Sequence, residues 1–144
     1  MRKTVIAIVI VILLVSIIIP AYAANSKAVI IEPGIETNYN AISAAKAELY
    51  FSGTSAKYSG IANAVSNSYT IKIKLRLQKR IDGIWTSFTV DEAQGIGISG
   101  AKLSLTRSGC AKGTSYRSYL YVAVYDSNNN YVESAHSYST VVVC

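Results

Sequence analysis

Few residues in this sequence are suited to catalysis. There is a single histidine, His136, in a run of Ser and Tyr residues. None of the many serines stands in a G-x-S-x-G pattern, the tight turn that presents a nucleophilic serine in α/β-hydrolases. Asp91 and Glu92 are adjacent, and adjacent side chains on an extended chain point apart, whereas a glycosidase needs two carboxylates that converge on one bond. We therefore expect no catalytic residues and a protein that is not an enzyme.

A glycine-rich run matches a cofactor motif but lacks its setting. Residues 95–100 read GIGISG, which fits G-x-G-x-x-G. In dinucleotide-binding proteins this motif follows a strand and opens a helix, whose N-terminus holds the pyrophosphate. Here the run leads into Ala101–Leu105, which alternate with polar residues and predict a strand. No acidic residue follows about twenty positions later, where the motif requires one. We interpret residues 95–100 as a flexible loop and expect no cofactor.

Two cysteines, Cys110 and Cys144, are the remaining reactive side chains. Residues 125–131 (YDSNNNY) predict a hairpin turn, because Asn and Asp tolerate the left-handed conformations that such turns need. If the first two asparagines form the loop, Cys144 falls opposite Gly113, and Cys110 lies three residues away in a loop that could fold back. We predict a Cys110–Cys144 disulfide rather than two free thiols. With one histidine and paired cysteines, we expect no metal site.

The first 23 residues, MRKTVIAIVIVILLVSIIIPAYA, have the three parts of a secretory signal peptide. Arg2 and Lys3 give a positive start, residues 5–19 are almost entirely apolar, and an A-x-A cleavage site ends at Ala23. The alternative is an uncleaved membrane anchor, but the apolar stretch is shorter than the roughly 20 residues of a spanning helix. We expect cleavage after Ala23 and a secreted protein, extracellular or loosely associated with the cell surface. Membrane contact is expected only through an uncleaved signal segment.

Size and charge indicate one small, modestly basic domain. Removing the 23-residue signal from the 144 residues leaves 121, enough for a single core. The sequence has 14 Lys and Arg against 8 Asp and Glu, a net charge of +6, which falls to +4 without Arg2 and Lys3. That charge favours anionic surfaces but lacks the density of a nucleic-acid binder. We expect no nucleic-acid partner.

The pattern of turns and strands predicts an all-β fold. Short runs of alternating apolar and polar residues are separated by turn signals every ten to fifteen residues or so. We predict an antiparallel immunoglobulin-like β-sandwich of about seven strands, with an open β-barrel as the alternative. A helical signal peptide (residues 1–23) and a lead-in segment (24–40, with one short strand at Val29–Ile31) would precede the domain at residues 41–144. Residues 41–51 are rich in alanine and could be helical by propensity, but their alternation favours a strand.

The clearest strand is residues 71–78 (IKIKLRLQ), with apolar side chains on one face and polar ones on the other. If Asp82-Gly83 forms a two-residue hairpin loop, Leu77 and Leu75 fall opposite Phe88 and Val90 on the buried face. Trp85 then falls opposite Arg80 on the solvent face. The predicted core is Ile71, Ile73, Leu75, Leu77, Phe88, Val90, Leu103, Leu105, Leu120, Val122 and Val124.

Cations and rings recur on the solvent side of three strands. In an immunoglobulin-like sheet, the strands predicted at residues 70–80, 116–125 and 131–143 would lie side by side. Rings beside cations suit sugars by stacking and anionic polymers by charge; the alternative is an ordinary solvated sheet face. We define the candidate binding face as Lys72, Lys74, Arg76, Arg80, Trp85, Arg117, Tyr119, Tyr121 and Tyr125, with His136 and Tyr138 as further outward residues.

Two segments carry a resemblance. LQKRIDGIWTSF, in which a basic strand enters a tight glycine turn before Trp85, and the hairpin YDSNNNYVES resemble short secreted proteins of Gram-positive bacteria. That family has no assigned function, and its members consist of a signal peptide and one small β domain. The resemblance covers roughly Ala41 to Val143 and implies the fold and the secretion. Family members often have Gly where this chain has Asn129, and the cysteine pair has no counterpart that we can map.

Two functions of different classes follow. The first is a binding module for anionic or carbohydrate cell-envelope polymers, with a cell-wall polymer or an extracellular glycan as partner. The second is a structural or protein-interaction module that acts through strand edges or self-association and has no small ligand, because unpaired edges can template pairing with another chain. We favour the first.

Overall fold

A computed structural model describes residues 39–144. The predicted signal peptide, its cleavage site and the short strand at Val29–Ile31 lie outside these residues. No helix within residues 39–144 is long and apolar enough to cross a membrane. The described residues form nine strands and one 3-10 turn: β1 Ile42–Ser52, β2 Ser55–Ala64, β3 Thr70–Ile81, β4 Ile84–Ser87, β5 Asp91–Ile96, η1 Gly97–Ser99, β6 Ala101–Arg107, β7 Ser115–Tyr125, β8 Tyr131–Tyr138 and β9 Val142–Val143.

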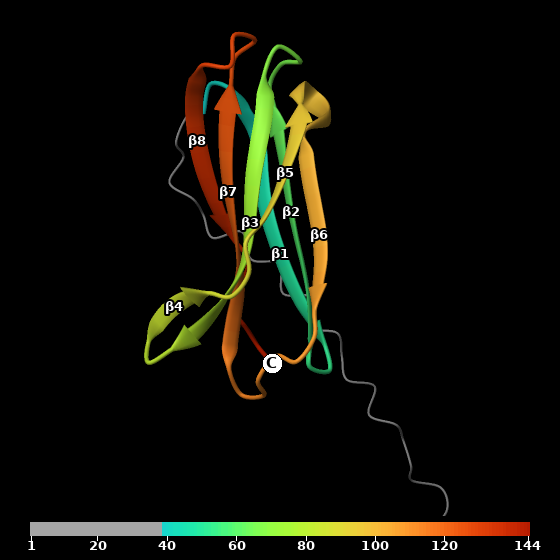
Figure 1. The fold of residues 1–144 in the computed structure, drawn as a ribbon, viewed down its shortest axis with the longest axis vertical. Helices are drawn as coiled ribbons and strands as arrows, with labels where there is room; N and C mark the ends of the chain where they lie inside the picture. Colours follow the sequence, from blue (N-terminus) through green and yellow to red (C-terminus); the bar gives the residue numbers. More distant parts are fainter. Residues whose placement is uncertain (1–38) are drawn as a thin grey trace, which may run out of the picture.

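The strands pair into two antiparallel sheets, consistent with the predicted β-sandwich (Figure 1). One sheet has the order β1-β2-β6. The other has the order β4-β3-β7-β8, with β5 also pairing with β3 and β9 with β7. The alanine-rich segment at residues 41–51 forms strand β1, as predicted. Nine strands exceed the predicted seven because the strand expected through Val90 ends at Ser87, before β5, and the last predicted strand divides into β8 and β9.

The hairpin at Asp82-Gly83 forms as predicted. Both residues have positive φ, 50° at Asp82 and 83° at Gly83, and a type I′ turn requires this left-handed conformation at both central positions. The strands on either side pair in the predicted register as far as Ser87, with Trp85 opposite Arg80. The turn chemistry of two residues therefore sets the pairing of β3 with β4.

Beyond Ser87 the register changes, and the prediction that Val90 lies in the core is wrong. Leu75 pairs with Asp91 instead of Val90. Because side chains alternate between the two faces of a strand, a shift of one residue reverses the face on which each lies. Val90 is consequently 53% exposed.

The hydroxyl of Thr89 provides the physical reason for the shift. It accepts a hydrogen bond from the backbone N–H of Leu77 at 3.3 Å, where a continuous strand would supply a backbone carbonyl. It also lies 3.0 Å from the hydroxyl of Tyr58, which extends from β2 in the other sheet. The Thr89 side chain thus replaces a backbone carbonyl as the partner of the Leu77 N–H. Strand β5 then pairs with β3 in a register shifted by one residue.

The rest of the predicted core lies between the sheets. Phe88, Leu103 and Leu105 are partly buried and pack against it. From the opposite sheet β2 contributes small residues, and a β-carbon on Gly60 would lie only 2.7 Å from Cδ1 of Leu120. The two layers therefore pack closely where Gly60 faces Leu120. The predicted residues that are fully buried are Ile71, Ile73, Leu75, Leu77, Leu120, Val122 and Val124.

The Glu133 carboxylate, in the larger sheet, binds the start of β1, the first strand of the smaller sheet. Glu133 on β8 accepts hydrogen bonds from three consecutive backbone N–H groups. Its Oε1 bonds to the N–H groups of Ala41 and Ile42, each at 2.7 Å, and its Oε2 bonds to that of Asn40 at 3.2 Å. Pairing between β1 and β2 begins at Ile42, so Glu133 holds the start of β1 against β8.

Residues 95–100 are not the flexible loop that the glycine pattern predicted. They complete β5 and form the 3-10 turn before β6, which is the strand expected after them. The side chain of Asn67 accepts a hydrogen bond from the N–H of Ile98 at 3.1 Å, and Asn63 donates one to the carbonyl of Ile98 at 2.7 Å. Gly97 has a φ of 60°, and a β-carbon there would collide with Asn67. Two asparagines therefore anchor this segment through hydrogen bonds to the backbone of Ile98.

Candidate functional site

The candidate binding face forms a single surface. Strands β3, β7 and β8 are neighbours in the larger sheet, as predicted. Directly paired residues lie on the same side of a sheet, so two rows of outward side chains cross all three strands. These rows are Lys74, Tyr121 and His136, and Arg76, Tyr119 and Tyr138.

Several cations of this face lie over an aromatic ring of a neighbouring strand. The distances from cation to ring centroid are 4.3 Å for Lys72 over Tyr125, 5.7 Å for Arg76 over Tyr119 and 5.9 Å for Arg80 over Trp85. A cation within about 6 Å of a ring face is attracted by the negative charge at that face. The rings therefore hold the cations close to the sheet.

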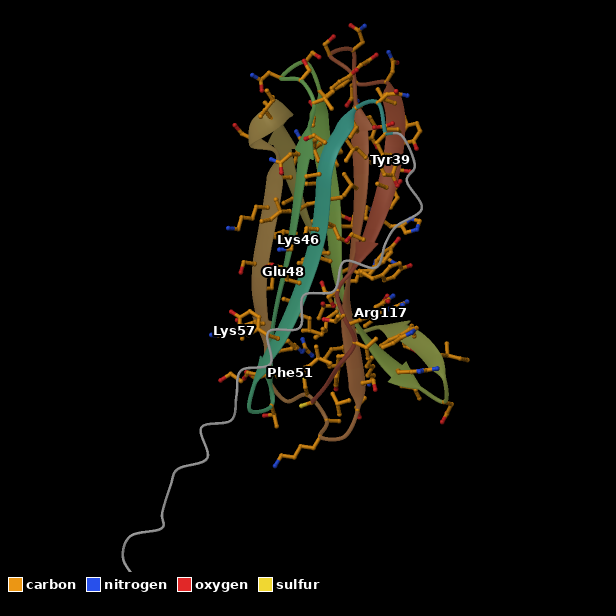
Figure 2. The ribbon with its side chains drawn as sticks, turned by 180° about the vertical axis from the view of Figure 1, so that it is seen from behind. Tyr39, Lys46, Glu48, Phe51, Lys57 and Arg117 are labelled. Atoms are coloured by element: carbon orange, nitrogen blue, oxygen red, sulfur yellow. The ribbon has the colours of Figure 1, made fainter. Side chains whose placement is uncertain are left out.

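Arg117 lies against two aromatic rings of the face. Its guanidinium carbon lies 4.4 Å from the ring centroid of Trp85 and 4.1 Å from that of Tyr138. Its Nε donates a hydrogen bond to Oε1 of Gln78 at 2.8 Å. Figure 2 shows Arg117 beside the hairpin of β3 and β4, which brings Trp85 within reach. Sequence reasoning missed Gln78 as part of the face, although the pairing of β3 with β7 puts it directly opposite Arg117.

Lys74 forms an ion pair with a carboxylate on a neighbouring strand. Its Nζ lies 2.8 Å from Oε1 of Glu92 on β5. Both side chains are well exposed, 45% for Lys74 and 61% for Glu92, and such surface pairs contribute little to stability. Sequence reasoning considered Glu92 only as the neighbour of Asp91, since the pairing of β5 with β3 was not foreseen.

The rings also contact one another. Tyr119 lies 5.1 Å from Tyr138 and 6.4 Å from His136, measured between ring centroids. Tyr125 similarly contacts Tyr131, its partner across the hairpin of β7 and β8, at 6.1 Å. Burial raises the pKa of Tyr119, and the nearby Tyr138 hydroxyl raises it further. The Tyr119 hydroxyl therefore stays protonated at neutral pH and can donate a hydrogen bond.

The two cysteines are free thiols in the structure, so the predicted disulfide is absent from it. The predicted proximity is present, because the N–H of Gly113 donates to the carbonyl of Cys144 at 2.9 Å. The thiols point at backbone oxygens instead of each other. Cys144 donates to the carbonyl of Cys110 at 3.4 Å, and Cys110 donates to that of Arg107 at 3.7 Å.

These environments predict an order of reaction for the thiols. Cys110 is 3% exposed, and burial raises its pKa, so little of it is the reactive thiolate near pH 8. We expect iodoacetamide to label Cys144 in the native protein at least about tenfold faster than Cys110. Peptide mass spectrometry measures the two rates, and the denatured protein should lose the difference. Faster labelling of Cys110, or labelling of neither thiol before reduction, would contradict this prediction.

Residues 39–144 contain no group of three or more His, Cys, Asp and Glu side chains that could hold a metal ion. No family model, curated protein or solved structure matches the chain. The resemblance to short secreted Gram-positive proteins thus remains a prediction, and functional inference has to start from the candidate binding face.

Proposed function

We propose that the protein is a secreted, non-enzymatic binding module for anionic or carbohydrate polymers of the cell envelope, and that it binds through the candidate binding face. One observation carries the proposal. Five cations and a set of Trp and Tyr rings gather on one face of the larger sheet. Among the strand residues of this face in the described part of the chain, Glu92 is the one carboxylate. The face therefore attracts anionic groups and offers rings and hydroxyls to sugars.

The proposal includes an immunoglobulin-like arrangement of the strands. In that fold the first, second and fifth strands share one sheet, and the third, sixth and seventh share the other. The same division holds here if β4 and β5 together count as the fourth strand, since β1, β2 and β6 form one sheet and β3, β7 and β8 belong to the other. The difference from the constant-type domain is that β4 and β5 pair with β3 rather than with the first sheet.

Co-sedimentation with purified cell walls across a salt series tests the binding function. The variant K72S/K74S/R76S removes three charges from the outward face of β3 and leaves its buried apolar face unchanged, so the fold should persist. We expect this variant to bind about tenfold or more weakly at low salt, and the difference should shrink as salt screens the charges. Circular dichroism checks that the fold is unchanged.

A matched control removes the same charge from the opposite sheet. Lys46, Lys57 and Lys102 point outward from β1, β2 and β6, and Figure 2 labels the first two. The variant K46S/K57S/K102S should bind walls within about twofold of the wild type, because its cations lie on the other layer. Equal loss in both variants would mean that only total charge matters and would contradict the proposal. Salt-resistant oligomers without wall binding would favour the strand-edge alternative.

A further inference from the structure

We infer that the ligand of the candidate binding face is a linear polyanion lying along β3, and not a neutral glycan stacked on the rings. The inference rests on the proposed function, because it names the class of polymer that the same face binds. Three features of the face support it: the cations over its rings, the spacing of its charges and their mutual repulsion.

The protein's own cations already lie over several of the rings on which a sugar would stack. Trp85 has Arg117 at 4.4 Å and Arg80 at 5.9 Å from its ring centroid. Tyr138 has Arg117 at 4.1 Å, and Tyr125 has Lys72 at 4.3 Å. A stacking sugar competes with these cations for the rings, whereas an anion binds the cations where they already lie. The main role of these rings is therefore to position the cations, rather than to offer a free ring face to a sugar.

The cations recur along β3 at a regular step. Alternate residues of a strand are about 6.6–6.8 Å apart, and Lys72, Lys74, Arg76 and Arg80 all lie on the outward face. Gln78 occupies the one uncharged position of this row. Arg117 supplies the missing charge from β7, since it pairs directly with Gln78 and donates a hydrogen bond to it at 2.8 Å. A row of five positive charges results, about 27 Å long.

Like charges at this spacing repel one another, and a chain of anionic groups laid along the row relieves the repulsion at every step. The Lys74–Glu92 pair does not block such a chain, because both side chains are exposed and can separate at little cost. A single small anion neutralises the positive charge at only one position of the row. The arrangement therefore favours a long polyanion over its monomer, whether the repeating group is phosphate or carboxylate.

Fluorescence titration of the intact protein tests the inference, since Trp85 is the sole tryptophan and lies at one end of the row. The probes are long-chain inorganic polyphosphate, poly-glutamate, inorganic phosphate and neutral dextran. At low salt we expect both polyanions to bind at least about tenfold more tightly than dextran, and more tightly than inorganic phosphate at equal anion concentration. Affinity should rise with polyphosphate length until the chain spans about 27 Å. The two polyanions together distinguish phosphate from carboxylate recognition.

Two single substitutions locate the site. Q78E places a negative charge within the row, between Arg76 and Arg80, and should weaken polyphosphate binding about three- to tenfold. S104E adds the same charge on β6 in the other sheet and should change the affinity less than about twofold. Equal effects of the two substitutions would overturn the placement of the polymer along β3.

The outcomes separate this inference from the function on which it rests. Dextran binding as tightly as the polyanions, or polyphosphate binding no more tightly than inorganic phosphate, would overturn the linear polyanion while leaving a binding module in place. If no probe binds and the protein also fails to sediment with purified walls, the proposed function itself is refuted.

Discussion

Substitution of Glu133 by alanine is expected to lower the free energy of unfolding by about 2–3 kcal/mol. Its carboxylate accepts hydrogen bonds from the backbone N–H groups of Asn40, Ala41 and Ile42. Hydrogen bonds to a charged group contribute about 1.5–3 kcal/mol each when buried. Glu133 is only partly buried, so in E133A water can hydrogen-bond some of the N–H groups that the carboxylate leaves. The expected loss of unfolding free energy is therefore smaller than the sum for three buried hydrogen bonds. Urea denaturation followed by circular dichroism measures the change.

Two comparisons make this prediction specific. E133Q keeps one side-chain oxygen as an acceptor and should lose about half as much stability as E133A. E48A removes a partly exposed carboxylate that pairs with Lys46 on the outer surface of β1, and it should cost about 1 kcal/mol or less. If E133A unfolds at the same urea concentration as the wild type, Glu133 does not hold β1 in place.

Substitution of Leu120 by alanine should cost about 2–5 kcal/mol, the usual range for a fully buried leucine. Leu120 is completely buried, and it pairs with Leu75 in the middle of the larger sheet. Opposite it lies Gly60 of β2, which has no side chain that could move into the cavity. The site can therefore relax little, which places the expected loss in the upper part of the range. Chemical denaturation with an unchanged m-value would show that stability alone has changed.

The close approach of Gly60 to Leu120 provides an internal check. A methyl group on Gly60 would lie 2.7 Å from Cδ1 of Leu120, so G60A alone should be destabilising. In L120A that methyl enters space that the leucine has vacated. The two substitutions together should therefore cost at least about 1 kcal/mol less than the sum of the single ones. Strict additivity would mean that the two layers do not pack at this point.

Local features of the sequence determined much of the fold. Strand β3 and its buried face follow from strict alternation, since side chains of a strand point to opposite sides in turn. The β3–β4 hairpin follows from Asp82 and Gly83, which adopt the left-handed conformation that this turn requires. The candidate binding face follows from the same alternation, once β3, β7 and β8 are taken as neighbours.

Contacts between residues far apart in the sequence decided the rest. The register after Ser87 depends on Thr89 meeting Tyr58 across the two sheets, a contact that no local pattern indicates. The thiols of Cys110 and Cys144 lie near each other but donate to backbone oxygens, an orientation that turn geometry does not determine.

The same limit applies to the site. Alternation shows which side chains face solvent, but only the pairing of β3 with β7 reveals that Arg117 completes a row of cations at Gln78. Likewise, Glu133 reaches β1 from a strand more than ninety positions away in the sequence. Periodicity and turn chemistry act between near neighbours and are visible in the sequence. Hydrogen bonds and ring contacts between distant strands depend on the three-dimensional register of those strands, and only the tertiary structure sets that register.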